Sequence, residues 1–455
     1  MESKLKPKYG LFTAISMVVG IVIGSGIFFK AGKVLNNTDG SMLKSLLVVA
    51  IIGAIMLICS LVFATLAQRY EKVNGLIDYA EVTVGSRYAY FMAWFMTTIY
   101  YPSITGTLAW VSASYTCALF GIPAAGGAHV AIGAFYLVAL YVMNSLSPKI
   151  GGKFQVSTTV IKMIPLVLMA IVGTIAGMLN GLTVQNFAET TTQIASSGGG
   201  GMFGAIVAFA FSYEGWIIAT SINAELKDSK KNLPRALVIG ALIVIAIYIL
   251  YFVGLTGSMP ISDMISAGDD LPKLAFSNVF GSFVGSIIYV FIVISCLGTT
   301  NGLMMGALRG AYSISARNRG PAPEHMSAVD PRSNAVTNSG LVGLLFCFLW
   351  YFYWQVCFIE GPGLGIPALL NWEPDELPII TLYGGYIPMF IAMIVKEKSL
   401  GKVKRFVLPG LAILSCAFMV FCAIYSYKIQ ALYYLIVFVV IMAFSLFFVK
   451  DKASK

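Results

Sequence analysis

The sequence predicts an all-α membrane protein with twelve transmembrane helices, and three observations support this fold class. Hydrophobic residues make up 58% of the 455 residues and charged residues only 11%, a balance far from that of soluble globular domains. Twelve apolar stretches reach about 20 residues, the length of helix that crosses a bilayer. Most lysines and arginines fall in every second connection, as expected if both termini are cytoplasmic.

The twelve stretches give the domain organisation. They begin near Leu11, Leu43, Tyr90, Ala128, Phe154, Met202, Ala236, Val279, Val336, Pro378, Phe406 and Ile429. Spans one to five fall within residues 1–182, spans six to ten within 183–398, and spans eleven and twelve with a cytoplasmic tail within 399–455. The net charge of +10 belongs to the cytoplasmic connections. We therefore expect a multi-pass protein of the cell membrane, with the lipid bilayer and no nucleic acid as a partner.

Little in the sequence supports an enzyme. The two histidines, His129 and His325, lie far apart, and the seven cysteines lie in or beside apolar spans without paired spacing. These residues provide neither a zinc site nor a catalytic group of serine, histidine and aspartate. We expect no catalytic residue, no metal and no cofactor.

Two spans carry glycine and polar residues at the depth where a helix should be continuous. The first contains Gly20-Ile-Val-Ile-Gly24-Ser25-Gly26, and the sixth contains Phe211-Ser212-Tyr213-Glu214-Gly215-Trp216. Broken backbone at this depth survives only where protein or a cavity surrounds it, although the glycine pair in the first span could instead serve close helix packing. Breaks five spans apart are typical of two five-helix units that form an inverted repeat.

The polar groups exposed at the two breaks favour a ligand that carries one negative and one positive charge. Free N–H groups at Ser25 and Gly26, at the electropositive start of a half-helix, would bind a carboxylate. Freed carbonyls of the first and sixth spans would accept from an ammonium a few ångströms away, as in the head group of an α-amino acid. The predicted substrate-binding residues are Val22, Ser25, Gly26, Ile27, Phe211, Ser212 and Glu214.

Lys162 lies in the middle of the fifth apolar span. It is nine positions beyond Lys153, which is roughly 13 Å along a helix in a hydrocarbon core about 30 Å thick. An ammonium at this depth costs about 2.5 kcal/mol or more, so we expect it to face the protein interior and to be held by oxygens. The alternative is a lysine at the end of a helix, if the span begins elsewhere.

Five motifs occur together in the first ten spans. They are Gly24-Ser25-Gly26-Ile27-Phe28, the stretch 211–216, the segment 225–235, Asn301-Gly302 with Arg309, and Gly320-Pro321 with Pro323. This set resembles the L-amino acid transporter family of the amino acid, polyamine and organocation transporter superfamily. The resemblance implies an inverted-repeat fold in which spans one and six are broken. It is strongest to bacterial exchangers of alanine, serine and cysteine, so we expect a bacterial origin.

The resemblance also implies a role for Lys162, which would fill the space that a sodium ion takes in sodium-coupled relatives of this fold. We expect its ammonium to donate to the carbonyl of Gly20 and to hydroxyls in spans seven and eight, namely those of Tyr248, Ser295, Thr299 and Thr300. The loop at residues 120–129 lacks the cysteine by which some family members bind a heavy subunit. No disulfide-linked partner is therefore expected.

The predicted function is sodium-independent exchange of small neutral L-amino acids, such as alanine, serine and cysteine, by alternating access. Glu214 would either line the side-chain pocket, where it favours hydroxyl, thiol or cationic side chains, or bind backbone donors freed by the break. Proton-coupled transport, in which Lys162 releases its proton, stays open, as does transport of cationic amino acids. A substrate-gated channel or a nutrient sensor is the more remote alternative.

Overall fold

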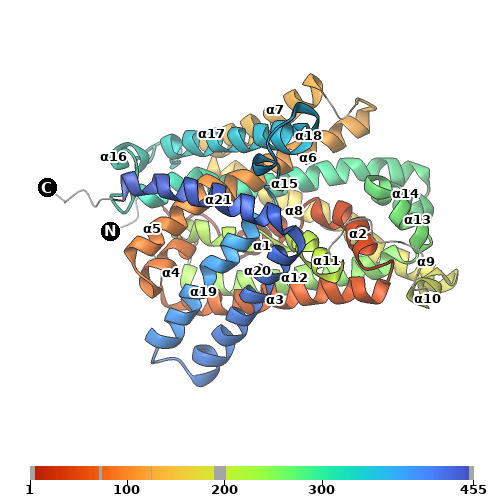
Figure 1. Ribbon diagram of the computed structural model, residues 1–455, viewed down its shortest axis with the longest axis horizontal. Coiled ribbons are helices and arrows are strands. Elements are labelled where there is room, and N and C mark those ends of the chain that lie inside the picture. The colour runs from red at the N-terminus through yellow and green to blue at the C-terminus, as the bar shows by residue number, and fades with distance from the viewer. Residues whose placement is uncertain (1–5, 71–73, 124–125, 189–200, 450–455) are drawn as a thin grey trace.

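The protein is an elongated bundle of helices in the computed structural model, which describes residues 6–70, 74–123, 126–188 and 201–449. These residues form helices joined by turns, with no strand among them. Figure 1 shows that most long helices run along the horizontal of the view. The end that carries α5, α16 and the last turns of α21 is called the near end. The opposite end, with α9, α10, α13 and α14, is called the far end.

The first five predicted spans are helices that begin close to their predicted positions. They are α1 (Leu11–Val22) with α2 (Gly26–Asn37), α3 (Met42–Arg69), α5 (Ser86–Phe95) with η1 (Met96–Tyr100) and α6 (Tyr101–Phe120), α7 (Gly127–Leu146), and α8 (Pro148–Leu168) with η2 (Met169–Gly173) and α9 (Thr174–Leu179). Two short helices lie in the connections, α4 (Gly75–Thr83) and α10 (Leu182–Ala188).

The next five predicted spans are also helical. They are α11 (Gly201–Ala210) with η3 (Phe211–Tyr213) and η4 (Trp216–Glu225), α12 (Ser229–Leu255), α15 (Ser282–Ser315), α17 (Thr337–Tyr353) with η6 (Trp354–Ile359), and α19 (Pro378–Lys396). Their connections contain α13 (Ile261–Ser266), η5 (Gly268–Asp270), α14 (Leu271–Phe280), α16 (Pro323–Met326), α18 (Gly361–Leu364) and η7 (Ala368–Leu370). The last two spans are η8 (Val403–Val407) with α20 (Leu408–Tyr427), and α21 (Ile429–Phe444) with η9 (Ser445–Phe448).

Within the described residues, 11 helices are long and apolar enough to cross a membrane. The third predicted span, formed by α5, η1 and α6, is not among them because it is rich in hydroxyl side chains. Its α6 packs against α7, α15 and α17, and its hydroxyls are bonded internally. Thr105 donates to the carbonyl of Tyr101 and Ser112 to that of Leu108, each at 2.6 Å. Because protein surrounds this helix and its own backbone accepts from its hydroxyls, it does not need a purely apolar sequence.

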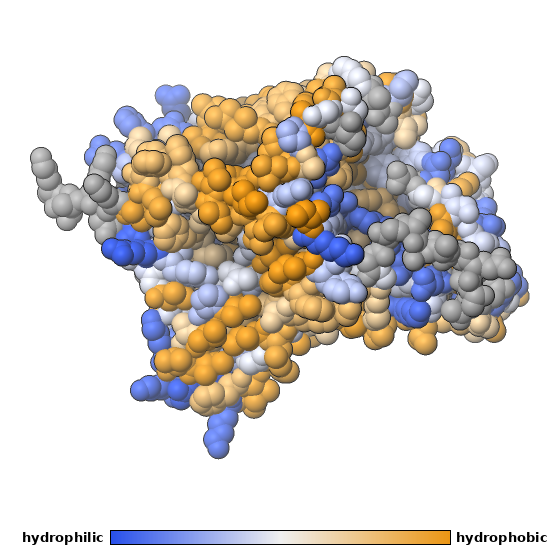
Figure 2. Space-filling view, in the orientation of Figure 1, coloured by the Kyte–Doolittle hydropathy of each residue, from blue (hydrophilic) through white to orange (hydrophobic). Residues whose placement is uncertain are grey.

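The surface of the bundle is that of a membrane protein. Figure 2 shows hydrophobic residues across the middle of the visible face, with hydrophilic residues gathered toward the near and far ends. Helix α21, which crosses this face, buries only Ala431 and Tyr434 completely. Large side chains such as Val439 and Val440 are more than half exposed there, as expected for residues that contact lipid.

Both predicted helix breaks are present. Helix α1 ends at Val22 and α2 begins at Gly26, while the sixth span passes from α11 into two 3₁₀ segments separated by Glu214 and Gly215. A Cβ atom at Gly26 would lie 2.5 Å from the hydroxyl of Ser212. Small residues therefore let the two breaks pack directly against each other, which confirms the prediction that spans one and six are interrupted.

Gly215 has no acceptable replacement at this contact. Its φ of +95° is in the left-handed region, and an added Cβ would lie 2.4 Å from Cγ2 of Ile21. We expect Gly215→Ala to lower the free energy of unfolding by about 1–3 kcal/mol, measured as thermal unfolding of the purified protein in detergent. Gly384→Ala in α19 is the matched control, because no atom lies within 4 Å of an added Cβ there. Equal melting temperatures for the two variants would contradict this account.

Candidate functional site

Lys162 is fully buried and connects α8 to the broken first span. Its Nζ lies 2.8 Å from the carbonyl oxygen of Gly20 and 2.6 Å from that of Ile23. From α15, the carbonyl of Ser295 lies at 2.9 Å and the hydroxyl of Thr299 at 3.2 Å. The last carbonyls of a helix have no partner within that helix. The ammonium therefore bonds acceptors that the break in α1 leaves free.

The predicted partners of Lys162 need three corrections. Ser295 contacts the ammonium through its carbonyl, while its hydroxyl lies 3.4 and 3.3 Å from the carbonyls of Ile23 and Gly24. The hydroxyl of Tyr248 does not contact Lys162, but lies 2.7 Å from the carbonyl of Ser212 and 3.1 Å from that of Val22. The hydroxyl of Thr300 donates to Cys296 in its own helix at 2.8 Å. Backbone oxygens satisfy the ammonium instead, because the broken helix exposes more acceptors than the sequence pattern reveals. Tyr248 joins the two breaks to each other.

A small cavity lies between the two breaks. Of the predicted substrate-binding residues, Val22, Gly26, Phe211, Ser212 and Glu214 line it. Its volume of about 10 Å³ is too small for an amino acid, so entry of any ligand requires side chains such as Phe211 to move. The hydroxyl of Ser212 is buried and makes no hydrogen bond with any residue that the structure describes.

Ser25 and Ile27 are buried beside this cavity but do not line it. Ser25 is the residue that precedes α2, and its side chain does not cap the helix. Ile27 lies in the first turn of α2. Their backbone N–H groups are the part that a carboxylate would use. The hydroxyl of Ser25, which is buried and lacks a partner among the described residues, is a further donor beside them.

Glu214 is held by a tyrosine that sequence reasoning did not find. The hydroxyl of Tyr100 donates to Oε2 of Glu214 at 2.7 Å, and both side chains are buried. The other carboxylate oxygen, Oε1, makes no hydrogen bond within the described part of the chain. Tyr100 lies in η1, where a π-helical turn rotates the following residues. No local sequence pattern marks such a turn, so the contact could not be predicted.

The near end is closed by a group of charges, here called the near-end cluster: Lys8, Glu225 and Arg309. Glu225 is buried, with an ion pair to Lys8 and another to Arg309, whose Nε lies 2.6 Å from Oε1. Backbone bonds accompany these pairs, since the N–H groups of Lys8 and Tyr9 donate to the carbonyl of Glu225 at 2.7 and 2.9 Å. The segment before α1 is thus tied to the end of η4.

The far end contains a cavity of about 670 Å³. Phe29 lines this cavity and Phe211 lines the small one, and their ring centroids are 6.1 Å apart. The two aromatic rings therefore stand between the far-end cavity and the space between the breaks.

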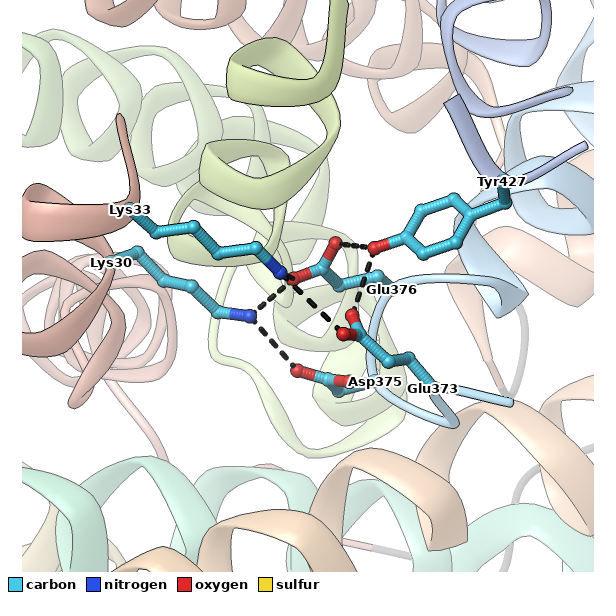
Figure 3. A network of polar contacts seen from close by, with 6 residues as sticks. All are labelled: Lys30, Lys33, Glu373, Asp375, Glu376 and Tyr427. Atoms are coloured by element: carbon cyan, nitrogen blue, oxygen red, sulfur yellow. Dashed lines mark hydrogen bonds and ion pairs between the residues drawn. The ribbon is translucent and has the colours of Figure 1, made fainter. Parts of the chain in front are cut away.

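One wall of the far-end cavity is a charged group, here called the far-end cluster: Lys30, Lys33, Glu373, Asp375 and Glu376. Figure 3 shows the two lysines of α2 pointing toward the three acids of the segment before α19, with Tyr427 of α20 on the other side. Lys30 is 5% exposed and pairs with Glu376. Although burial raises the pKa of Glu376, the charges of Lys30 and Lys33 hold it far below its usual range.

These features define the class of protein. A membrane-spanning bundle in which two broken spans face each other, with polar groups between them, one end closed and a cavity at the other, is a secondary transporter of the inverted-repeat kind. A family model described as amino acid permease matches residues 9–452. The chain therefore belongs to the amino acid permease family, which confirms the resemblance to the amino acid, polyamine and organocation superfamily and to its L-amino acid transporters.

Three relatives illustrate the similarity. The serine/threonine exchanger SteT of Bacillus subtilis (strain 168) is 29% identical over 413 residues, which cover 90% of this chain and 87% of that protein. The b(0,+)-type amino acid transporter 1 of Homo sapiens is 28% identical over 316 residues, or 68% of this chain and 63% of the relative. The cystine/glutamate transporter of Homo sapiens is 26% identical over 337 residues, or 73% and 65%. The protein is thus a multi-pass membrane transporter of amino acids.

Lys162 is the first residue to test. We expect Lys162→Ala to reduce the initial rate of amino acid transport at least about tenfold, a change of about 1.4 kcal/mol in the barrier, because the freed carbonyls of α1 lose their common donor. Lys153→Ala, on the same helix but exposed, is the matched control. Uptake into proteoliposomes, normalised to folded protein by size-exclusion chromatography, measures the effect. Wild-type transport by the Lys162 variant would show that this lysine is only structural.

Proposed function

We propose that the protein is a sodium-independent exchanger of small neutral L-amino acids, such as alanine, serine and cysteine, that works by alternating access. The observation that carries the proposal is the position of the Lys162 ammonium, which lies among oxygens of the broken first span and of α15. A fixed cation at this junction supplies the positive charge for which a transporter would otherwise bind a metal ion. The exchanger SteT, similar along 90% of this chain, supports exchange as the mode of transport.

The substrate head group would bind between the two breaks. In this proposal, N–H groups at Ser25 and Gly26 take the carboxylate at the electropositive start of α2. The ammonium binds carbonyls on the opposite side, near Val22, Phe211 and Glu214. The hydroxyl of Ser212, which lacks a partner among the described side chains and backbone groups, offers one more hydrogen bond.

The side chain of the substrate would face a narrow, mostly apolar space. Ile104 and Leu108 of α6 and Leu303 of α15 line the small cavity, and these large side chains leave room for a short substituent. Side-chain hydroxyls or thiols would be compatible with this space because Oε1 of Glu214, which lacks a partner among the described residues, can accept a hydrogen bond from them. Preference for alanine, serine and cysteine over leucine or tryptophan follows from this geometry.

The direction of the protein in the membrane is part of the proposal. Lysine and arginine are concentrated in the connections of the near end, which we therefore place in the cytoplasm with both termini. The far-end cavity then opens to the outside of a bacterial cell, while the near-end cluster closes the path inward. Two five-span repeats, residues 1–182 and 183–398, would move relative to each other during transport. We expect the chain to act without a disulfide-linked heavy subunit.

A second candidate function rests on Glu214. A buried carboxylate whose Oε1 lacks a partner in the described structure suits the cationic side chain of arginine or lysine. Proton-coupled transport is the other alternative, since a buried lysine can lose its proton during a cycle. The two experiments below separate these alternatives from the main proposal.

Replacement of sodium tests the role proposed for Lys162. We expect choline in place of sodium to leave the initial rate of alanine or serine uptake unchanged, because the ammonium already occupies the junction. Uptake is measured in proteoliposomes loaded with unlabelled amino acid, at several external pH values and with no pH gradient as the control. A steep dependence of the rate on external sodium would refute the proposal. Uptake driven by a proton gradient alone would replace exchange by proton coupling.

Competition by substrate analogues tests the head-group site. An unpaired buried polar group costs about 1–3 kcal/mol, so ethylamine, which is alanine without its carboxylate, should compete at least about tenfold more weakly than alanine. Inhibition of labelled alanine uptake measures the competition, with D-alanine and leucine as further probes of shape. Equal competition by ethylamine would refute the head-group model. Arginine that competes more strongly than alanine, and loses this advantage in Glu214→Gln, would establish the cationic alternative.

A further inference from the structure

The far-end cluster contains more negative than positive charge. Two ammonium groups, of Lys30 and Lys33, face the three carboxylates of Glu373, Asp375 and Glu376 (Figure 3). With every group ionised, one carboxylate charge has no counterpart in the cluster. Because all three acids are largely buried, such a charge is costly unless a further cation joins it.

The two lysines are bound very differently. Lys30 is buried, pairs with Glu376, and lies 3.5 Å from Oδ2 of Asp375. The side chain of Lys33 is 43% exposed, and its nearest carboxylate oxygens are at 3.3 and 3.5 Å. The ammonium of Lys33 is therefore held by long contacts and is free to bind an anion in the cavity beside it.

Three buried polar atoms of residues that line this cavity lack a partner among the described residues. They are Oδ1 of Asp375, Oγ1 of Thr107 and Nε1 of Trp354. Each belongs to a side chain that is at least nine-tenths buried. Native proteins pair nearly all such atoms. An acceptor and two donors unpaired around one space indicate a ligand with both kinds of polar group.

The remaining walls suit an amino acid side chain. Trp110, Phe358 and Ile359 line the cavity, and its volume of about 670 Å³ is in the range of small-molecule sites. Phe29 lines this cavity, and its ring packs against that of Phe211, which lines the small cavity between the breaks.

We propose that the far-end cavity is a second amino acid site, in which Asp375 binds the ammonium of the incoming amino acid and Lys33 binds its carboxylate. This inference rests on the proposed function, since the same substrates would bind at the far end before they reach the site between the breaks. The ammonium supplies the donor that Oδ1 of Asp375 lacks among the described residues. Thr107 and the indole N–H of Trp354 complete the hydrogen bonds of the carboxylate.

Binding of a substrate at this site would also change the contacts of α2, the second half of the first broken span. Lys30 is shared between Asp375 and Glu376, and its Nζ lies 5.1 Å from the ring centre of Phe29 and 5.4 Å from that of Phe211. An ammonium on Asp375 competes with the 3.5 Å contact to Lys30. The lysine then pairs with Glu376 alone, which removes one of the four ion-pair contacts between α2 and the acids of the far-end cluster.

A proton and the substrate ammonium compete for the same carboxylates of the far-end cluster. Burial and the charge of Glu376 raise the pKa of Glu373 to about 7, and burial also raises the pKa of Asp375. The groups that face these acids are Lys30 and Lys33 of α2, Tyr427 of α20, and Asp270 of η5 across the cavity. Below pH 7 the cluster gains a proton and loses the charge that attracts the ammonium. Affinity at the far-end site should therefore fall as the pH drops through 7.

Binding stoichiometry tests the proposal. Equilibrium binding of labelled alanine and serine to the purified full chain in nanodiscs should show two sites per chain at pH 8. Asp375→Asn should leave one site, and Lys33→Gln should weaken one of the two about tenfold. Lys44→Gln is the matched control, because Lys44 is also a half-exposed lysine paired with an acid, Asp39, but does not line the cavity. It should keep both sites.

A second set of variants separates this inference from the proposed function. Gly26→Val fills the space beside Ser212 and should remove only the site between the breaks, so the remaining binding should disappear in Gly26→Val with Asp375→Asn. A single site in the wild-type chain, or two sites of unchanged affinity in both Asp375→Asn and Lys33→Gln, would overturn the far-end site and leave the proposed function intact. Absence of any alanine or serine binding would overturn both.

Discussion

The bond between the Lys162 ammonium and the open end of α1 is the constraint on which the site depends. A membrane-spanning helix that stops at Val22 exposes carbonyls where neither water nor lipid can bond them. The ammonium reaches the carbonyls of Gly20 and Ile23, and the hydroxyl of Tyr248 reaches that of Val22. Because donors from α8 and α12 satisfy these acceptors, the break can exist at this depth and the polar groups of α2 can face a ligand.

The two halves of each broken span are attached to different partners. The near-end half α1 packs on η4, while the far-end half α2 packs on α11. Backbone bonds between Tyr9 and the end of η4, together with the near-end cluster, fix the first pair. The second pair is held at its far end by side-chain ion pairs around a large cavity. The near-end half of the first span is thus held by backbone bonds as well as ion pairs, whereas its far-end half is held at its end by side-chain ion pairs.

Local sequence patterns predicted the fold class, the two breaks and the burial of Lys162, because each depends on residues close together in the chain. The glycines around Ser25 and the apolar run around Lys162 are visible without any tertiary information. The contacts of Tyr100 with Glu214 and of Lys30 with Glu376 join residues separated by 114 and 346 positions. Lys30 at the end of an apolar stretch resembles an ordinary loop charge, and only the folded position of Glu376 makes it a buried ion pair. The third span is less apolar than a lipid-facing helix for a related reason. Other helices surround it, and the sequence does not identify these neighbours.

The two ends of the bundle differ in their balance of buried acidic and basic side chains. At the near end, Lys8 and Arg309 share the single carboxylate of Glu225, and backbone bonds reinforce the closure. At the far end, three carboxylates share two lysines, and a cavity borders them. Between these ends, the Lys162 ammonium is bonded by three backbone carbonyls and the hydroxyl of Thr299, which are all neutral oxygens. In the proposed function, a ligand with both charges would meet the far-end carboxylates first and then the N–H groups of α2. The two broken spans would bind its head group, while Lys162 bonds the carbonyls that the break in α1 leaves free.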